Sequence, residues 1–71
     1  MRVAVVKAGF DDDARVWYVE HSDIEGLHVE GETFEALRQN VASATADLVS
    51  DVTAEDVHIE IIAHASVRVA A

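Results

Sequence analysis

One amphipathic segment in the middle of the chain constrains the fold more than any other feature of the sequence. Its apolar residues recur at spacings of three and four from Phe34 to about Ser50, which is the period of a helix with one buried stripe. Thr33 precedes it as a suitable amino-terminal cap, and Glu35 in the first turn suits the helix dipole. A chain of 71 residues with one such helix is expected to hold a single domain, residues 1–71, with a marginal core. The predicted stripe consists of Phe34, Leu37, Val41, Ala44 and Leu48.

Four segments with strand-like sequences flank this helix. Arg2 to Phe10 is rich in β-branched residues and apolar on both faces, which is typical of a central strand. The acidic turn at Asp11 to Asp13 is short, so we expect an antiparallel hairpin with a second strand at Val16 to Glu20. Leu27 to Glu30 and Val57 to Ala63 are the third and fourth predicted strands.

The remaining segments connect or extend these elements. Ile24 to Leu27 predicts a type II turn, because Gly26 occupies the third position, where a positive φ is needed. Asp51 to Asp56 is a polar connection between the helix and the fourth strand. Beyond that strand, Val67 and Val69 alternate with polar residues, so the tail is expected to add a short strand, in this chain or in another subunit.

The predicted order of elements is therefore βββαβ, and the fold class is α+β. A strand that follows a crossover helix can lie parallel to an earlier strand. Placing the fourth strand beside the first gives the sheet order 3-2-1-4, with the apolar first strand in the centre. One helix packs on only one face of this small sheet, so the other face needs a cover, most simply a second copy of the chain. We therefore expect a homodimer or a higher oligomer.

The charge balance restricts the partners. Fourteen acidic residues against five basic ones give a net charge of −9, which argues against binding to nucleic acid or to an anionic membrane. The same charge suits a basic protein partner, although it would also serve solubility alone. No apolar stretch approaches the ~20 residues of a membrane span, and no signal-peptide core is present, so a cytoplasmic location is expected.

No catalytic constellation is found, and we predict neither an enzyme nor a cofactor. The chain has no cysteine, its glycines are isolated, and its hydroxyl residues lie in turn, cap or solvent contexts. The four histidines lack zinc-binding spacing, so no metal site is expected. His21 and His28 could still approach each other across the second turn and, with Asp23, trap a metal adventitiously.

Two aromatic residues on the second strand suggest an interface. Trp17 and Tyr18 are adjacent and must point to opposite faces, so at most one of them serves the core under the helix. The other lies on the second face or at an interface, unless both pack locally. Together with the acidic Asp23 and Glu25, they form the predicted partner interface.

Three stretches resemble HicB-like antitoxin domains in their order and spacing. Phe10 to Val19 is similar to the first hairpin of these domains, and Ser22 to Leu27 to their aspartate-aliphatic-proline-glycine turn. Glu30 to Leu37 resembles their acidic, threonine-capped helix start. The likeness covers roughly Val3 to Ile62.

The resemblance implies a partial ribonuclease H-like fold and an antitoxin-type role, in which the chain binds and masks a small basic ribonuclease toxin of the HicA type. Glu25 stands where the family has proline, and no DNA-binding domain follows the fourth strand, so this sequence resembles the short, stand-alone members. Operator binding is therefore not expected. Ribonuclease H chemistry needs acids gathered on the first strand, and Arg2 to Phe10 contains none, so we expect no nuclease activity.

Three hypotheses follow, in order of preference. The first is a non-catalytic, antitoxin-like module that binds a basic protein. The second is a stand-alone homo-oligomer with a regulatory or structural role and no toxin partner. The third is a small enzyme or metal-binding protein that uses His21, Asp23 and His28.

Overall fold

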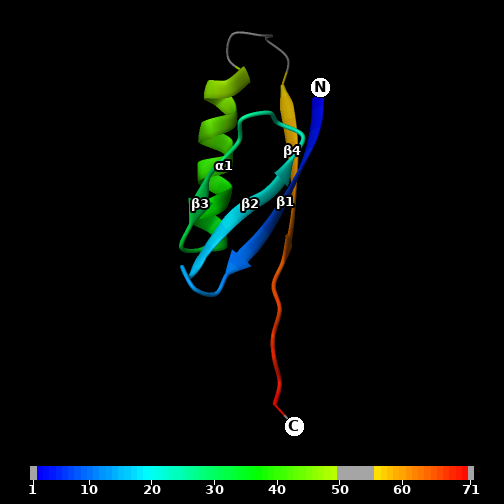
Figure 1. The fold of residues 1–71 in the computed structure, drawn as a ribbon. Coiled ribbons are helices and arrows are strands. Elements are labelled where there is room, and N and C mark those ends of the chain that lie inside the picture. Colours follow the sequence, from blue (N-terminus) through cyan, green and yellow to red (C-terminus); the bar gives the residue numbers. More distant parts are fainter. Residues whose placement is uncertain (1, 50–55, 71) are drawn as a thin grey trace.

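The structure, a computed structural model, describes residues 2–49 and 56–70 as a four-stranded sheet with one helix packed on it (Figure 1). The sheet order is β3-β2-β1-β4, with β2 antiparallel to both neighbours and β4 parallel to β1. The predicted fold class, element order and strand order are therefore confirmed. The elements are β1 (Arg2–Asp11), β2 (Val16–Ser22), β3 (Glu30–Gly31), α1 (Phe34–Val49) and β4 (Val57–His64).

Two predicted features fall partly outside the described residues. The helix was expected to reach about Ser50, and the described part of α1 ends at Val49. The predicted polar connection lies outside the described residues except for Asp56, whose carbonyl accepts a hydrogen bond from the Arg2 N–H at 2.9 Å. Within residues 2–49 and 56–70, no helix combines the length and the apolar character needed to cross a membrane.

The β1–β2 hairpin is built as its turn sequence predicts, but with one irregularity. Asp11 Oδ1 accepts hydrogen bonds from the N–H groups of Asp13 and Ala14 at 2.9 and 3.1 Å, which fixes the acidic turn. Further along, Ala8 lies opposite Val19 and Lys7 opposite His21, so Glu20 is an extra residue in a β-bulge. The bulge lets β2 continue to Ser22, two residues beyond its predicted end at Glu20.

The third strand is shorter and later than predicted. The turn before it is as expected: Gly26 has φ +85°, and the Leu27 N–H donates to the Ile24 carbonyl at 3.3 Å. The chain then directs the Leu27 side chain into the core, where it is 3% exposed, instead of pairing at once with β2. The prediction of a strand from Leu27 to Glu30 is therefore wrong, and β3 comprises only Glu30 and Gly31.

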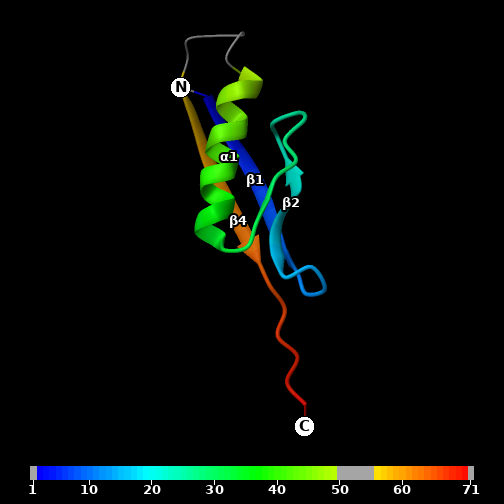
Figure 2. The ribbon, with the colours of Figure 1, turned by 90° about the vertical axis from the view of Figure 1, so that its left-hand side faces the viewer.

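The core lies between α1 and the face of the sheet that it covers (Figure 2). The N-cap is confirmed, because Thr33 Oγ1 accepts a hydrogen bond from the Ala36 N–H at 3.0 Å. The predicted stripe is wrong at Leu48, which is 43% exposed, whereas Thr45 is buried. The Leu48 side chain lies next to Gly26, and because glycine has no side chain, Leu48 stays partly exposed. The buried apolar residues are Ala4, Val6, Ala8, Ile24, Leu27, Leu37 and Val41.

The opposite face of the sheet carries both apolar and charged side chains. Val3 on β1 and Ile62 on β4 are each 57% exposed. On the same face, the His64 imidazole and the Glu20 carboxylate form a hydrogen bond at 2.5 Å across β1. Beyond His64, residues 65–70 extend away from the sheet and form no strand within this chain (Figure 1).

Candidate functional site

The two aromatic residues of the predicted interface lie on opposite faces of β2. Trp17 faces the helix, where its ring meets those of Phe10 and Phe34 edge-on, with centroid distances of 5.2 and 5.6 Å. Tyr18 is on the open face beside Gly9, whose missing side chain leaves room for the phenol. The structure therefore does not bring Trp17 and Tyr18 into one surface.

Asp23 has a structural role at the end of the β1–β2 ladder. Its Oδ2 accepts a hydrogen bond from the Val5 N–H at 2.9 Å, and its own N–H donates to the Val5 carbonyl at 3.1 Å. Asp23 thus continues the pairing of β2 with β1 past Ser22. Glu25, two residues later, lies in the turn from Ile24 to Leu27 and is exposed.

Replacing Asp23 with alanine is expected to lower the free energy of unfolding by about 1 kcal/mol, because the Val5 N–H loses its acceptor. Urea unfolding followed by circular dichroism measures this change. The matched control is Glu25→Ala, which removes an exposed carboxylate from the next turn and should cost less than about 0.5 kcal/mol. Equal losses in the two variants would show that the bond to Val5 adds nothing to stability.

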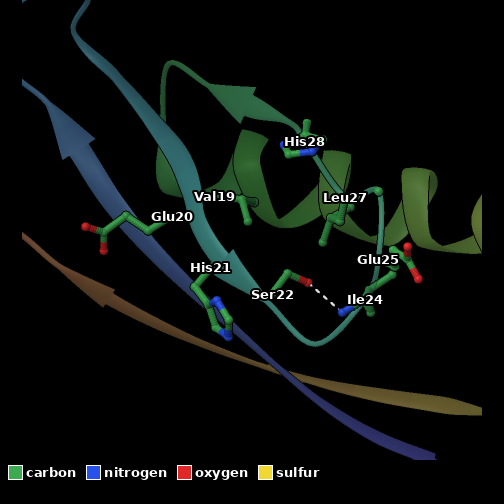
Figure 3. A pocket seen from close by; sticks show the side chains of 9 residues that line it. Val19, Glu20, His21, Ser22, Ile24, Glu25, Leu27 and His28 are labelled. Carbon is green, nitrogen blue, oxygen red and sulfur yellow. Dashed lines mark hydrogen bonds between the residues drawn. The ribbon is translucent and has the colours of Figure 1, made fainter.

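A depression runs along the outer edge of β2, where β3 is too short to cover it (Figure 3). One hollow of about 220 Å³ lies between residues 19–22 of β2 and the loop of residues 24–28. A second hollow of about 290 Å³ adjoins it and shares Val19 and His28 in its lining. We call these two hollows, lined by residues 18–22 and 24–30, the β2-edge groove.

Local hydrogen bonds hold both walls of the β2-edge groove. Ser22 Oγ accepts a bond from the Ile24 N–H at 2.9 Å, which fixes the tight departure of the loop from β2. On the other wall, Asn40 Nδ2 of α1 donates to the Glu30 carbonyl at 2.8 Å and ties β3 to the helix. These two bonds tie the loop to the end of β2 and β3 to α1.

The histidines of the groove are not arranged as a metal site. His21 and His28 both line it, but their rings do not face each other (Figure 3). Asp23, their suggested partner, is turned toward Val5 of β1. Across residues 2–49 and 56–70, no three His, Cys, Asp or Glu side chains come together in a way that could hold a metal ion.

The electrostatic character of the groove is acidic. Between Arg15 and Arg38 the sequence contains no lysine or arginine. This uninterrupted run supplies both walls of the groove, and Glu20, Glu25 and Glu30 are among the lining residues, although the Glu20 carboxylate itself points away from the hollow toward His64 (Figure 3). The acids of the run are Glu20, Asp23, Glu25, Glu30, Glu32 and Glu35.

Of the four residues in the predicted partner interface, Tyr18 and Glu25 line this groove, whereas Trp17 and Asp23 do not. Sequence reasoning missed Glu20 and Glu30, although the absence of lysine and arginine from position 16 to 37 was a readable signal. It could not show that Glu20 reaches across β1 to His64, because that contact depends on the bulge and on the pairing of β1 with β4.

The fold and the groove define a class: a small α+β domain with a mixed 3-2-1-4 sheet, one helix on one face and an acidic depression at the edge of β2. Within this class, the chain belongs to the family described as a domain of unknown function, DUF1902, whose model matches residues 3–71. The matching family model is DUF1902, so the HicB likeness remains a resemblance.

A solved structure shares this fold. The crystal structure of the hypothetical protein TTHA1013 from the extremely thermophilic bacterium Thermus thermophilus is similar with a TM-score of 0.69 and 28% sequence identity. The similarity covers 97% of this chain and 99% of that chain. A comparison with curated proteins gives no match.

Proposed function

We propose that this chain is a non-catalytic protein-binding module of the antitoxin type, whose β2-edge groove binds a small basic protein. The observation that carries the proposal is the acidic run between Arg15 and Arg38, which forms both walls of the groove without any lysine or arginine. Complementary charge speeds the encounter of such partners and rejects partners of the wrong sign.

The shape of the groove also supports a protein partner. The groove is an open depression at the edge of a strand rather than an enclosed cavity, and its two hollows of about 220 and 290 Å³ adjoin along β2. The groove also follows a part of β2 where the backbone is only partly paired: the ladder to β3 comprises two residue pairs, supplemented by one bond from the Val19 N–H to the Val29 carbonyl at 3.3 Å. An extended segment of a partner can add to such an edge by main-chain hydrogen bonds.

The HicB resemblance suggests which basic protein this is. All three similar stretches contribute lining residues to the groove, since Tyr18 and Val19 end the first stretch, Ser22 to Leu27 is the second and Glu30 begins the third. We therefore propose a small ribonuclease toxin of the HicA type as the partner, held so that its own active surface is masked. We do not propose catalysis by this chain. Ribonuclease H chemistry needs acidic residues on the first strand, and the one acid on β1, Asp11, accepts hydrogen bonds from the N–H groups of its own turn.

The experiment is affinity copurification of the tagged chain from its native cells, with mass spectrometry of the retained proteins. We expect one small basic protein near a stoichiometric ratio. The double variant Glu25→Gln/Glu30→Gln should weaken its binding about tenfold, because two groove charges are lost. Isothermal titration with the recovered protein measures the dissociation constant.

The control variant removes the same amount of charge elsewhere. Asp12→Asn/Asp13→Asn lies in the exposed β1–β2 turn, outside the β2-edge groove, and should change the affinity by less than about threefold. Equal weakening by both double variants would mean that only net charge matters, and the groove assignment would be wrong.

A second candidate function is that of a stand-alone homo-oligomer without a toxin. The observation that favours it is that Val3 and Ile62 are exposed on the face of the sheet that α1 does not cover. Recovery of the chain alone as a defined oligomer, in the same copurification, would support this candidate over the first.

A further inference from the structure

The tail beyond β4 is extended and is not packed against the described residues of its own chain. Val67 and Val69 are each 85% exposed, and residues 65–70 make no hydrogen bond or ion pair with the described parts of the chain. The tail projects well clear of the sheet (Figures 1 and 2). The radius of gyration is accordingly 13.7 Å, against about 11 Å for a compact chain of this length.

The strand that leads into this tail is an unprotected sheet edge. β4 pairs with β1 on one side only, over eight residues and without a register shift. Natural edge strands are normally blocked by lysine, proline or a bulge, and Val57–His64 contains none of these. With the tail, it forms a continuous extended segment from residue 57 to 70 that offers backbone groups to another strand.

We propose that this segment is a dimerisation surface, in which the tail of each chain pairs antiparallel with β4 of a second copy. The proposal does not depend on the basic partner proposed above, because β2 and β4 flank β1 on opposite sides in the sheet. An antiparallel pair related by a two-fold axis satisfies the requirement that the same patch serves both subunits.

The charges of the segment select one register. Residues 57–70 contain one acidic residue, Glu60, and one basic residue, Arg68. With His64 on the two-fold axis, Arg68 lies opposite the partner's Glu60, and both stand on the open face. Moving the axis by one residue in either direction places Arg68 opposite His58 or Ile62 of the partner subunit, so only the axis at His64 pairs the opposite charges.

The same register gives the two tail valines an apolar environment. Val67 lies opposite the partner's Ile61 and Val69 opposite the partner's Ile59, on the side that carries the helix, and in this chain Ile59 and Ile61 are partly buried there. Between α1 and β4 that side has a hollow of about 270 Å³ at the sheet edge. Val69 of the second copy reaches its mouth. The hollow is lined by Ala42, Thr45, Ala46, Val49, Asp56, Val57 and Ile59.

Charge reversal tests the register directly. Sedimentation equilibrium of the full chain should show a dimer, and Arg68→Glu or Glu60→Arg alone should each raise its dissociation constant about tenfold, because two pairs per dimer become repulsive. The double variant should restore it to within about threefold of the original value. Both residues are exposed and neither has an ion pair with a described residue, so circular dichroism should show an unchanged fold.

Cysteine cross-linking provides an independent readout, since the chain has no native cysteine. His64→Cys should form an intermolecular disulfide on mild oxidation, because the two copies of this residue face each other on the axis. Ser66→Cys is the control: its two copies lie four residues apart along the strands, about 13 Å, which is too far for a disulfide. A monomer, a dimer insensitive to both charge reversals, or equal cross-linking at the two positions would overturn the proposal.

Discussion

Replacing Leu37 with alanine is expected to lower the free energy of unfolding by about 2–5 kcal/mol. Leu37 is 0% exposed and belongs to the core cluster between α1 and the central strand, which also contains Val6 and Val41. Truncation removes buried apolar surface and leaves a cavity that the surrounding backbone can fill only in part. A domain of this size has about 3–5 kcal/mol of core stability, so the Leu37→Ala variant should lose a large part of its stability and unfold at a much lower urea concentration.

Thermal and urea unfolding, followed by circular dichroism, measure this loss. Leu48→Ala is the matched control, because it is the same chemical change on the same helix at a position that is 43% exposed. Its expected cost is below about 1 kcal/mol. Similar losses in the two variants would show that burial under α1 is not what stabilises this domain.

Replacing Gly31 with alanine is expected to cost about 3 kcal/mol or more, since an added methyl group has no space to occupy. A Cβ at this position would lie 2.5 Å from the backbone nitrogen of Leu37 and 2.9 Å from the carbonyl carbon of Ala36. These atoms belong to the first turns of α1 and cannot shift without moving the helix off the sheet. We therefore expect β3 to separate from α1, with loss of the wall that carries Glu30.

Gly9→Ala is the control for this prediction. A Cβ at Gly9 would come within 3.3 Å of the ends of the Glu20 and Tyr18 side chains, which can rotate away. Its cost should therefore be no more than about 1 kcal/mol. The two variants are compared by urea unfolding, and a Gly9→Ala variant as unstable as Gly31→Ala would contradict the role assigned to the helix backbone.

The parts of the fold that sequence predicted are those set by local chemistry. The Thr33 cap, the acidic turn after β1 and the type II turn at Gly26 each depend on a few neighbouring residues. The central place of β1 followed from apolar residues on both of its faces, and the parallel partner β4 from the crossover helix.

The parts that sequence did not predict depend on contacts between distant segments. The bulge at Glu20 changes the alternation of β2, and no residue of β2 marks it in advance. Leu48 has the right spacing for the core but lies above Gly26, which only the folded chain brings beneath it. Asp23 was predicted to meet a partner because it is acidic and in a turn, whereas its carboxylate accepts the N–H of Val5, 18 residues away.

The pairing of β1 with β4 also determines when the protein can fold during its synthesis. Arg2 is opposite Val57, so 55 positions must be added to the nascent chain before the central strand gains its second neighbour. At typical translation rates this takes about 3–11 s, far longer than a hairpin or a helix needs to form. Until then the edge of β1 that pairs with β4 has no partner strand. The sheet therefore cannot be completed until β4 has been synthesised and has left the exit tunnel.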